Sequence, residues 1–132
     1  MIEITSFGYL HDEVPANLDL TLDARDLIRD PHVDPALRQM TGRDAEVQNA
    51  VMGTPGAEAL VALLVQAATA LDVIADGDGW VRVAVGGQSG RHRSVVLAEA
   101  VGTTLSLQGR EVQIYHRDID QPVMERSGSE VA

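Results

Sequence analysis

The sequence predicts a single small α/β domain, with a mainly parallel four-stranded sheet flanked by helices. Three observations predict this class. Short β-type apolar runs alternate with helix-length apolar stripes along the 132 residues. The elements follow in the order strand, strand, helix, helix, strand, helix, strand, which favours a parallel sheet. A glycine-rich turn joins the third strand to the helix that follows, and sheets of this kind bind ligands at the carboxyl ends of their strands.

Four segments have the pattern of strands. Residues 2–8 (IEITSFG) alternate and end at a glycine, and residues 18–24 (LDLTLDA) alternate as well. Residues 80–87 (WVRVAVGG) are apolar on both faces near their end, which indicates a central strand. A turn at Gly109 then leads into a fourth strand within residues 110–118.

Three segments have the pattern of helices. Asp44 is placed to cap a helix over residues 45–52. Thr54 is placed as the N-cap of a long helix that ends near residue 75, and residues 92–107 form the third. The side chains predicted to face the core from the long helix are Leu60, Leu63, Leu64, Ala67, Ala68 and Leu71. Those predicted to face it from the third helix are Val95, Val96, Ala98, Val101 and Leu105.

Composition narrows the function classes. The net charge of −10 argues against a general nucleic-acid binder, because such binding depends on neutralising phosphates. The absence of cysteine excludes disulfides, thiolate metal sites and a cysteine nucleophile. No signal peptide or membrane span is predicted, so we expect a cytoplasmic protein. We expect one domain over residues 1–120 and a flexible tail over residues 121–132.

The most informative segment is the loop GGQSGRHRS at residues 86–94. Helix N-termini leave backbone N–H groups unpaired and carry partial positive charge, and glycines let such groups converge on one anion. Arg91 and Arg93 add full charge, and His92 and Ser94 add hydrogen-bonding groups. The pattern therefore predicts a phosphate-binding loop between the third strand and its helix. The alternative is a plain strand-to-helix turn.

The loop also has the spacing of the phosphatase motif Cys-x5-Arg-Ser/Thr. Counting back from Arg93 places Gly87 at the nucleophile position. Because the chain has no cysteine, thiol-phosphate chemistry is excluded and only the anion cradle is expected. The loop matches neither the Walker A motif nor the dinucleotide fingerprint.

Five motifs occur in order: SFG at 6–8, LDAR at 22–25, DPHVDPALRQMTGRD at 30–44, GGQSGRHRS at 86–94 and HRD at 116–118. Together they resemble the C-terminal domain of the RNase adapter protein RapZ and its relatives, which are often named nucleotide-binding proteins. The resemblance covers about residues 3–118. It implies an α/β fold likened to sugar-phosphate enzymes and the binding of glucosamine-6-phosphate, as in the enterobacterial adapter.

The resemblance implies a ligand pocket assembled from three segments. Its residues would be Asp23, Arg25, His32, Arg38, Thr41, Gly42, Gly87, Gln88, Ser89, Gly90, Arg91, His92, Arg93 and Ser94. His116 and Arg117 are candidates for the rim of that pocket. No metal site or cofactor is expected.

The sequence departs from the family pattern at four points. The kinase-like N-terminal domain with its Walker motif is absent, so we expect a stand-alone domain without ATP chemistry. The family's Cys-Thr-Gly is Gly87-Gln88-Ser89 here. One residue is inserted between Asp23 and His32. The basic C-terminal run that helps the adapter bind small regulatory RNA is replaced by MERSGSEVA.

The leading functional hypothesis is a sensor that holds a phosphorylated small molecule, with an amino-sugar phosphate as the expected class. The alternative is an RNA-binding or protein-adapter module, in which Arg91, Arg93, Arg110 and Arg117 would form one basic face. A weaker hypothesis is an enzyme that uses His92 as a general acid or base on a sugar phosphate. No membrane partner is expected, and a homo-oligomer is left open.

Overall fold

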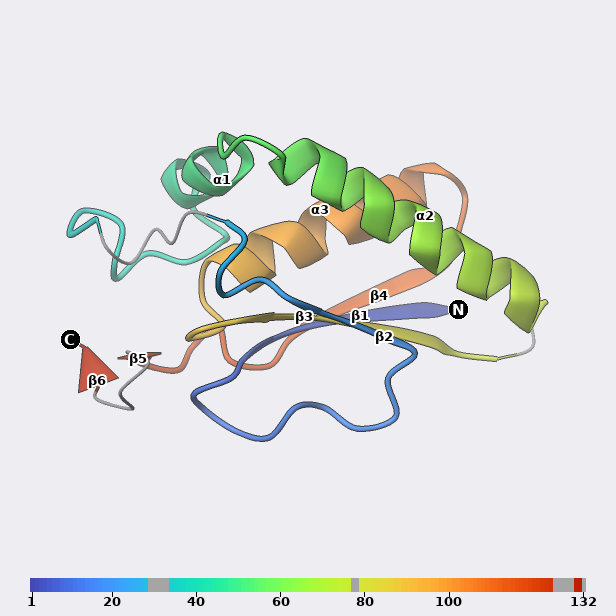
Figure 1. Ribbon diagram of the computed structural model, residues 1–132, viewed down its shortest axis with the longest axis horizontal. Helices are drawn as coiled ribbons and strands as arrows, with labels where there is room; N and C mark the ends of the chain where they lie inside the picture. Colours follow the sequence, from blue (N-terminus) through green and yellow to red (C-terminus); the bar gives the residue numbers. More distant parts are fainter. Residues whose placement is uncertain (29–33, 77–78, 125–129, 132) are drawn as a thin grey trace.

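Four parallel strands form the sheet, as the sequence predicts (Figure 1). They are β1 (Ile2–Gly8), β2 (Leu20–Asp23), β3 (Val81–Gly87) and β4 (Val112–His116), in the order β2-β3-β1-β4. The pairs β1–β3, β1–β4 and β2–β3 are all parallel. The computed structural model describes residues 1–28, 34–76, 79–124 and 130–131.

Three helices lie on one face of the sheet (Figure 1). They are α1 (Ala45–Met52), α2 (Ala57–Ala75) and α3 (Arg93–Leu107). α3 packs against β1, β3 and β4, and α2 packs against α3 and β3. The element order and the α/β class are therefore those predicted. On the other face, the connection from β1 to β2 passes below the sheet (Figure 1).

Helix α2 begins later than predicted, and Thr54 is not its cap. The Thr54 hydroxyl donates to the carbonyl of Ala50, which closes α1 instead. Gly56 precedes α2 with a φ of 91°, a left-handed conformation that favours glycine. At the start of α1, Asp44 is the N-cap residue but makes no side-chain capping bond, because its carboxylate accepts from the N–H of Thr41.

The buried stripe of α2 is rotated from the predicted one. Its buried residues are Ala57, Val61, Leu64, Val65 and Ala68. Leu63, which we predicted to face the core, is 61% exposed. The reason is that α2 packs on both α3 and β3, so the buried positions are those 4, 7, 8 and 11 residues after Ala57. The five core positions predicted for α3 are all buried.

The fold also bears on two predictions, that no helix spans a membrane and that residues 121–132 form a tail. α2 is the one helix in the described part of the chain that is long and apolar enough to cross a membrane. One stripe of this helix packs on the core, and Asp72 near its end pairs with Arg110 at 2.6 Å. In residues 121–132, predicted to be a flexible tail, β5 (Val123–Met124) pairs antiparallel with β6 (Glu130–Val131), and Val123 is buried. The domain boundary at residue 120 stays a prediction.

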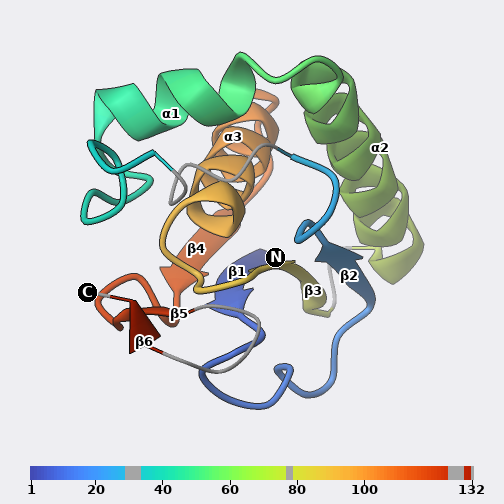
Figure 2. The same cartoon turned by 60° about the vertical axis from the view of Figure 1, so that its left-hand side comes forward.

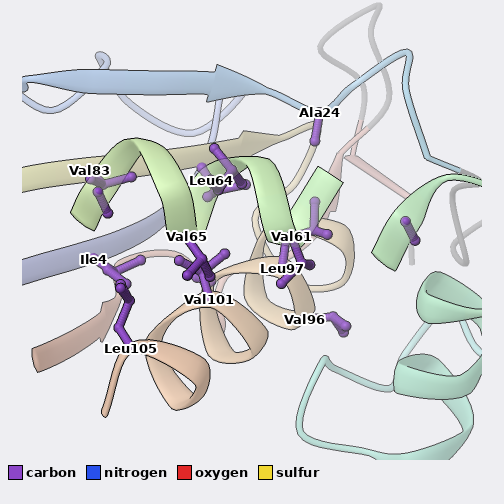
Figure 3. Packing of buried hydrophobic residues seen from close by; sticks show 14 of the residues in the cluster. Ile4, Ala24, Val61, Leu64, Val65, Val83, Val96, Leu97, Val101 and Leu105 are labelled. Carbon is purple, nitrogen blue, oxygen red and sulfur yellow. The ribbon is translucent and has the colours of Figure 1, made fainter. Parts of the chain in front are cut away.

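The core lies between the sheet and the helices (Figure 3). Ile4 and Val83 from the sheet meet Val65 from α2 and Leu97 and Val101 from α3 (Figure 3). Because nearly all of this surface is aliphatic, the fold is held mainly by the burial of apolar side chains. This layer fixes α3, and with it the start of α3, above the carboxyl ends of β1 and β3.

Leu97→Ala removes a side chain that is 0% exposed, whereas Leu63→Ala removes one on the outer face of α2. We expect Leu97→Ala to lower the free energy of unfolding by about 2–5 kcal/mol, because it leaves a cavity. We expect Leu63→Ala to change it by less than about 0.5 kcal/mol. Urea denaturation followed by circular dichroism measures both, and equal losses would contradict this packing.

Candidate functional site

The connection from β3 to α3 runs along the edge where the carboxyl ends of the strands meet (Figure 2). The parallel ladders pair Gly8 of β1 with Gly87 of β3, and Asp23 of β2 with Gly86 of β3. The loop that follows, residues 88–92, therefore starts between the ends of β1 and β2. This is the place where open parallel sheets bind their ligands.

The loop touches the end of β1 so closely that both sides must be glycine. A Cβ on Gly8 would lie 2.4 Å from the carbonyl carbon of Ser89. A Cβ on Gly90 would lie 2.6 Å from the backbone nitrogen of Gly8, and Gly90 has a φ of 77°. The obstacles are backbone atoms, which cannot rotate away. The same close backbone contact therefore explains why glycine is needed both at the end of SFG and at the third glycine of the loop.

The carbonyl groups of the loop are turned toward neighbouring segments. Those of Gly87 and Gln88 accept from the N–H groups of residues 9 and 10, at 2.9 and 3.2 Å. The carbonyl of Arg91 accepts from the N–H of Gly42 at 2.7 Å. These three carbonyls are therefore occupied by donors outside the loop.

A small hollow lies inside the loop, lined by the consecutive residues Gly87–Arg93. Its volume of about 10 Å³ has room for roughly one water molecule. No acceptor in the described part of the chain contacts the N–H of Gly90 or of Arg91. A tetrahedral anion would therefore place one oxygen inside and its other oxygens at the mouth.

Ser94 has a buried hydroxyl beside the hollow that makes no hydrogen bond within the described part of the chain. The residue is 0% exposed, and no described residue makes a hydrogen bond to its Oγ. The Oγ lies 3.4 Å from the point where a Cβ on Gly87 would sit, so it faces the lining of the hollow. Buried hydroxyls are almost always paired, and an unpaired one calls for a specific explanation.

The three charged or ionisable residues of the loop hold neighbouring segments in place. Arg93 is 4% exposed and donates through Nη1 to the carbonyls of Arg25 and Ile28. Arg91 donates to the carbonyls of Gln39 and Gln121, both at 2.8 Å. The Nε2 of His92 lies 2.8 Å from the carbonyl of Met40; since a carbonyl only accepts, this nitrogen carries the proton.

Asp23 and Arg25 form an ion pair at the same edge of the sheet. The guanidinium of that pair stacks on the ring of Tyr9. The Arg25 guanidinium donates to both Asp23 oxygens and lies 3.8 Å from the centre of the Tyr9 ring. The hydrogen bond to Asp23 raises the pKa of Arg25. Partial burial first, and then the Asp23 carboxylate, raise the pKa of the Tyr9 phenol, while Arg25 opposes them. Both members of the pair keep exposed surface, at 33% and 43% of their side chains.

The segment that contains Arg38, Thr41 and Gly42 flanks the loop. Gly42 contacts Arg91 as described, and a Cβ at Gly42 would lie 2.5 Å from Val95. The Thr41 hydroxyl accepts from the N–H of Arg43, which organises the turn before α1. His32, the remaining predicted pocket residue, lies outside the described residues.

His116 is directed beneath α3, away from the pocket rim where we placed it. Its Nδ1 lies 2.6 Å from the Oγ of Ser6, and its Nε2 lies 2.7 Å from the carboxylate of Glu99. The His116 side chain is only 5% exposed. β4 ends at this residue, and the side chain fills the space between β1 and α3.

Arg117 forms a clasp with Asp118, a residue that the sequence analysis missed. Arg117 donates to both Asp118 oxygens and to the carbonyls of residues 8, 12 and 13. Asp118 is 4% exposed and also accepts from the N–H of Gly8 at 2.7 Å. The only sequence signal for it was its place in the motif HRD. The clasp fixes the β1 end against which Gly90 packs.

The predicted basic face does not form. Arg110 precedes β4 at the amino end of the sheet, where it pairs with Asp72. Arg91, Arg93 and Arg117 lie at the carboxyl end and donate to carbonyls or to Asp118. The two groups are separated by the length of the strands. In the described part of the chain, no group of three or more His, Asp or Glu side chains could hold a metal ion.

The chain was compared with protein families and with known proteins. Residues 1–120 match the family model described as the RapZ C-terminal domain. The chain belongs to the RapZ C-terminal domain family. It is similar to proteins named nucleotide-binding protein, with 38% identity in Parafrankia (88% of this chain, 40% of the relative) and 41% in Thermus thermophilus (92% and 44%). A relative of the same name in Sphingopyxis alaskensis is 38% identical over 91% of this chain and 38% of its own length.

The chain therefore spans about two fifths of the length of these relatives. The family match includes β1–β4, α1–α3 and every residue of the loop. All the predicted site residues fall within it, so the fold and the loop belong to the shared part of the family.

Gly90→Ala is expected to destabilise the chain much more than Gly109→Ala does. Both glycines have positive φ, which costs a non-glycine residue about 1–2 kcal/mol. A Cβ at Gly109 meets open space, whereas one at Gly90 overlaps the backbone of residues 7 and 8 and adds about 1–3 kcal/mol of overpacking. Urea denaturation of the two variants compares them directly. Equal losses would show that the loop does not touch β1.

Proposed function

We propose that this chain is a non-catalytic regulatory module whose loop 87–94 holds the phosphate group of a small metabolite. The observation that carries the proposal is the buried Oγ of Ser94, which has no partner among the described residues and faces the hollow. A phosphate oxygen would accept a hydrogen bond from it and from the N–H groups at the start of α3, where the helix dipole favours negative charge.

The surrounding groups support recognition of one terminal phosphate without chemistry on it. The hollow has room for one oxygen, and no cysteine is present to attack phosphorus. The Nε2 of His92 donates to the carbonyl of Met40, which favours a structural role over general acid–base catalysis. Asp23 and Arg25 offer a paired carboxylate and guanidinium at the same edge, suited to the hydroxyl or amine groups of an amino-sugar phosphate.

Ser94→Ala is expected to stabilise the free protein by about 1 kcal/mol, because it removes a buried hydroxyl that lacks a partner. The same variant is expected to bind phosphate esters about tenfold less tightly, since one hydrogen bond to a charged group is worth about 1.5–3 kcal/mol. Thermal unfolding with and without glucosamine-6-phosphate measures both effects. For the unmodified chain, ligand at about 100 times its Kd should add about 2.7 kcal/mol.

Ser106→Ala is the matched control, because Ser106 lies on the exposed side of the same helix. It should change neither the stability nor the ligand-induced shift. The thermal shifts caused by inorganic phosphate and by a nucleoside monophosphate, compared with that of the sugar phosphate, show which kind of phosphate compound binds most tightly. The proposal fails if none of these compounds shifts the unfolding temperature, or if Ser94→Ala responds to them as the unmodified chain does.

A second candidate is an adapter module for an RNA or protein partner. The family match favours it more directly than it favours a metabolite, because the matched family resembles an RNase adapter. The net charge of −10 and the absence of one basic face favour a protein partner over RNA. Filter binding of structured RNA at about 50 and 200 mM salt separates the two, since binding through phosphates weakens steeply with salt. RNA binding without salt dependence would contradict an electrostatic RNA adapter.

A further inference from the structure

A second cavity, far larger than the loop hollow, lies on the side of α3 that faces away from the sheet. Its volume is about 710 Å³, within the range of roughly 300–1,000 Å³ that is usual for small-molecule sites. Its lining residues come from α1, α2, α3 and the turn before α1. In Figure 2, α1 and α2 lie on either side of α3. We infer that this cavity binds a small organic cation with an apolar body, such as an alkylammonium compound.

The floor and walls supply the apolar part of such a site. Val96 and Ala100 come from one stripe of α3, Met52 from the end of α1 and Val61 from α2. Val96 and Val61 are also core residues, so this surface is fixed by the packing beneath it. A hydrocarbon chain on this floor would be removed from water on one side, at about 0.8 kcal/mol for each buried CH₂ group.

The charges on the lining select a cation. The lining contains two carboxylates, Glu58 and Glu99, and one guanidinium, Arg43, so it carries a net charge of −1. Glu58 lies in the first turn of α2, where the helix dipole by itself favours an acid. Glu99 lies in the middle of α3 and has no such explanation. It is therefore the residue on which the cation preference depends.

The carboxylate of Glu99 is held in place by two buried side chains that lie between α3 and the sheet. His116, 5% exposed, donates through Nε2 to Glu99 Oε1 at 2.7 Å, and Ser6, 0% exposed, contacts His116 Nδ1 at 2.6 Å. No described residue donates to the second oxygen, Oε2. The Glu99 side chain is 45% exposed, so that oxygen is open to a ligand. A carboxylate supported in this way needs little reordering to bind an ammonium group.

The site is separate from the loop but adjoins it through Gly42. Gly42 lines the cavity and also donates its N–H to the carbonyl of Arg91 in the loop. The inference does not depend on phosphate binding, because the cavity, its charges and its floor exist without an occupied loop. The overall charge of −10 also raises the concentration of small cations near the surface.

Hexylammonium, hexanoate and hexanol are the three probes that test the inference by amide and methyl NMR shifts of the full chain. We expect hexylammonium alone to bind measurably, and to move the signals of Met52 and Thr103. Glu99→Gln should weaken hexylammonium binding about tenfold. Glu111→Gln changes the net charge equally but lies outside the cavity, and it should change the affinity less than twofold.

Thr103→Lys provides a test that does not disturb His116. Thr103 is an exposed lining residue of α3, and a lysine there places an ammonium group at the site. Binding of hexylammonium should be lost while the unfolding temperature is unchanged. The inference is overturned if hexanoate binds as tightly as hexylammonium, if Glu99→Gln and Glu111→Gln behave alike, or if the shifts map to the exposed face of α2 around Leu63.

Discussion

The close approach of two backbone segments, the end of β1 and the loop after β3, is the constraint on which the site depends. At Gly8 and Gly90 the two chains pass so near each other that neither position has room for a Cβ. Asp118 completes the contact, because its buried carboxylate accepts the N–H of Gly8 while Arg117 neutralises it. With this edge fixed, the carbonyls of Gly87 and Gln88 accept from the N–H groups of the two residues that follow β1 by one and two positions, and the carbonyl of Arg91 accepts from the N–H of Gly42.

Arginine has an unexpected function in this chain. A sequence with ten arginines and no lysine, several of them beside a glycine-rich loop, suggests a surface built to bind phosphates. In the structure, Arg91, Arg93 and Arg117 instead join segments far apart in the sequence by donating to backbone carbonyls. A guanidinium suits this work because it offers five donors in a rigid plane. These bonds tie the loop to the segments around residues 25, 39 and 121.

α3 links the two sites of the molecule. Its first turn forms part of the loop hollow, and its middle forms the floor of the larger cavity. The same helix packs on the sheet and buries Leu97, Val101 and Leu105 in the core (Figure 3). Both sites therefore stand on one rigid element, and the turn at Gly42 touches both.

The sequence by itself determined the α/β class, the order of the elements, the glycine-rich loop and the family, because periodicity, glycine and local motifs are properties of short segments. It placed the four strands to within two residues at their ends, placed α3 to within one, and located the loop. Only the tertiary structure decided where the arginines point, that Ser94 is buried with no partner among the described residues, and that His116 supports Glu99 rather than the pocket rim. It also rotated the buried stripe of α2. The physical reason is that these outcomes depend on partners distant in the chain: the bond from Gly8 to Asp118 spans 110 residues, and no local pattern records which donor meets which acceptor.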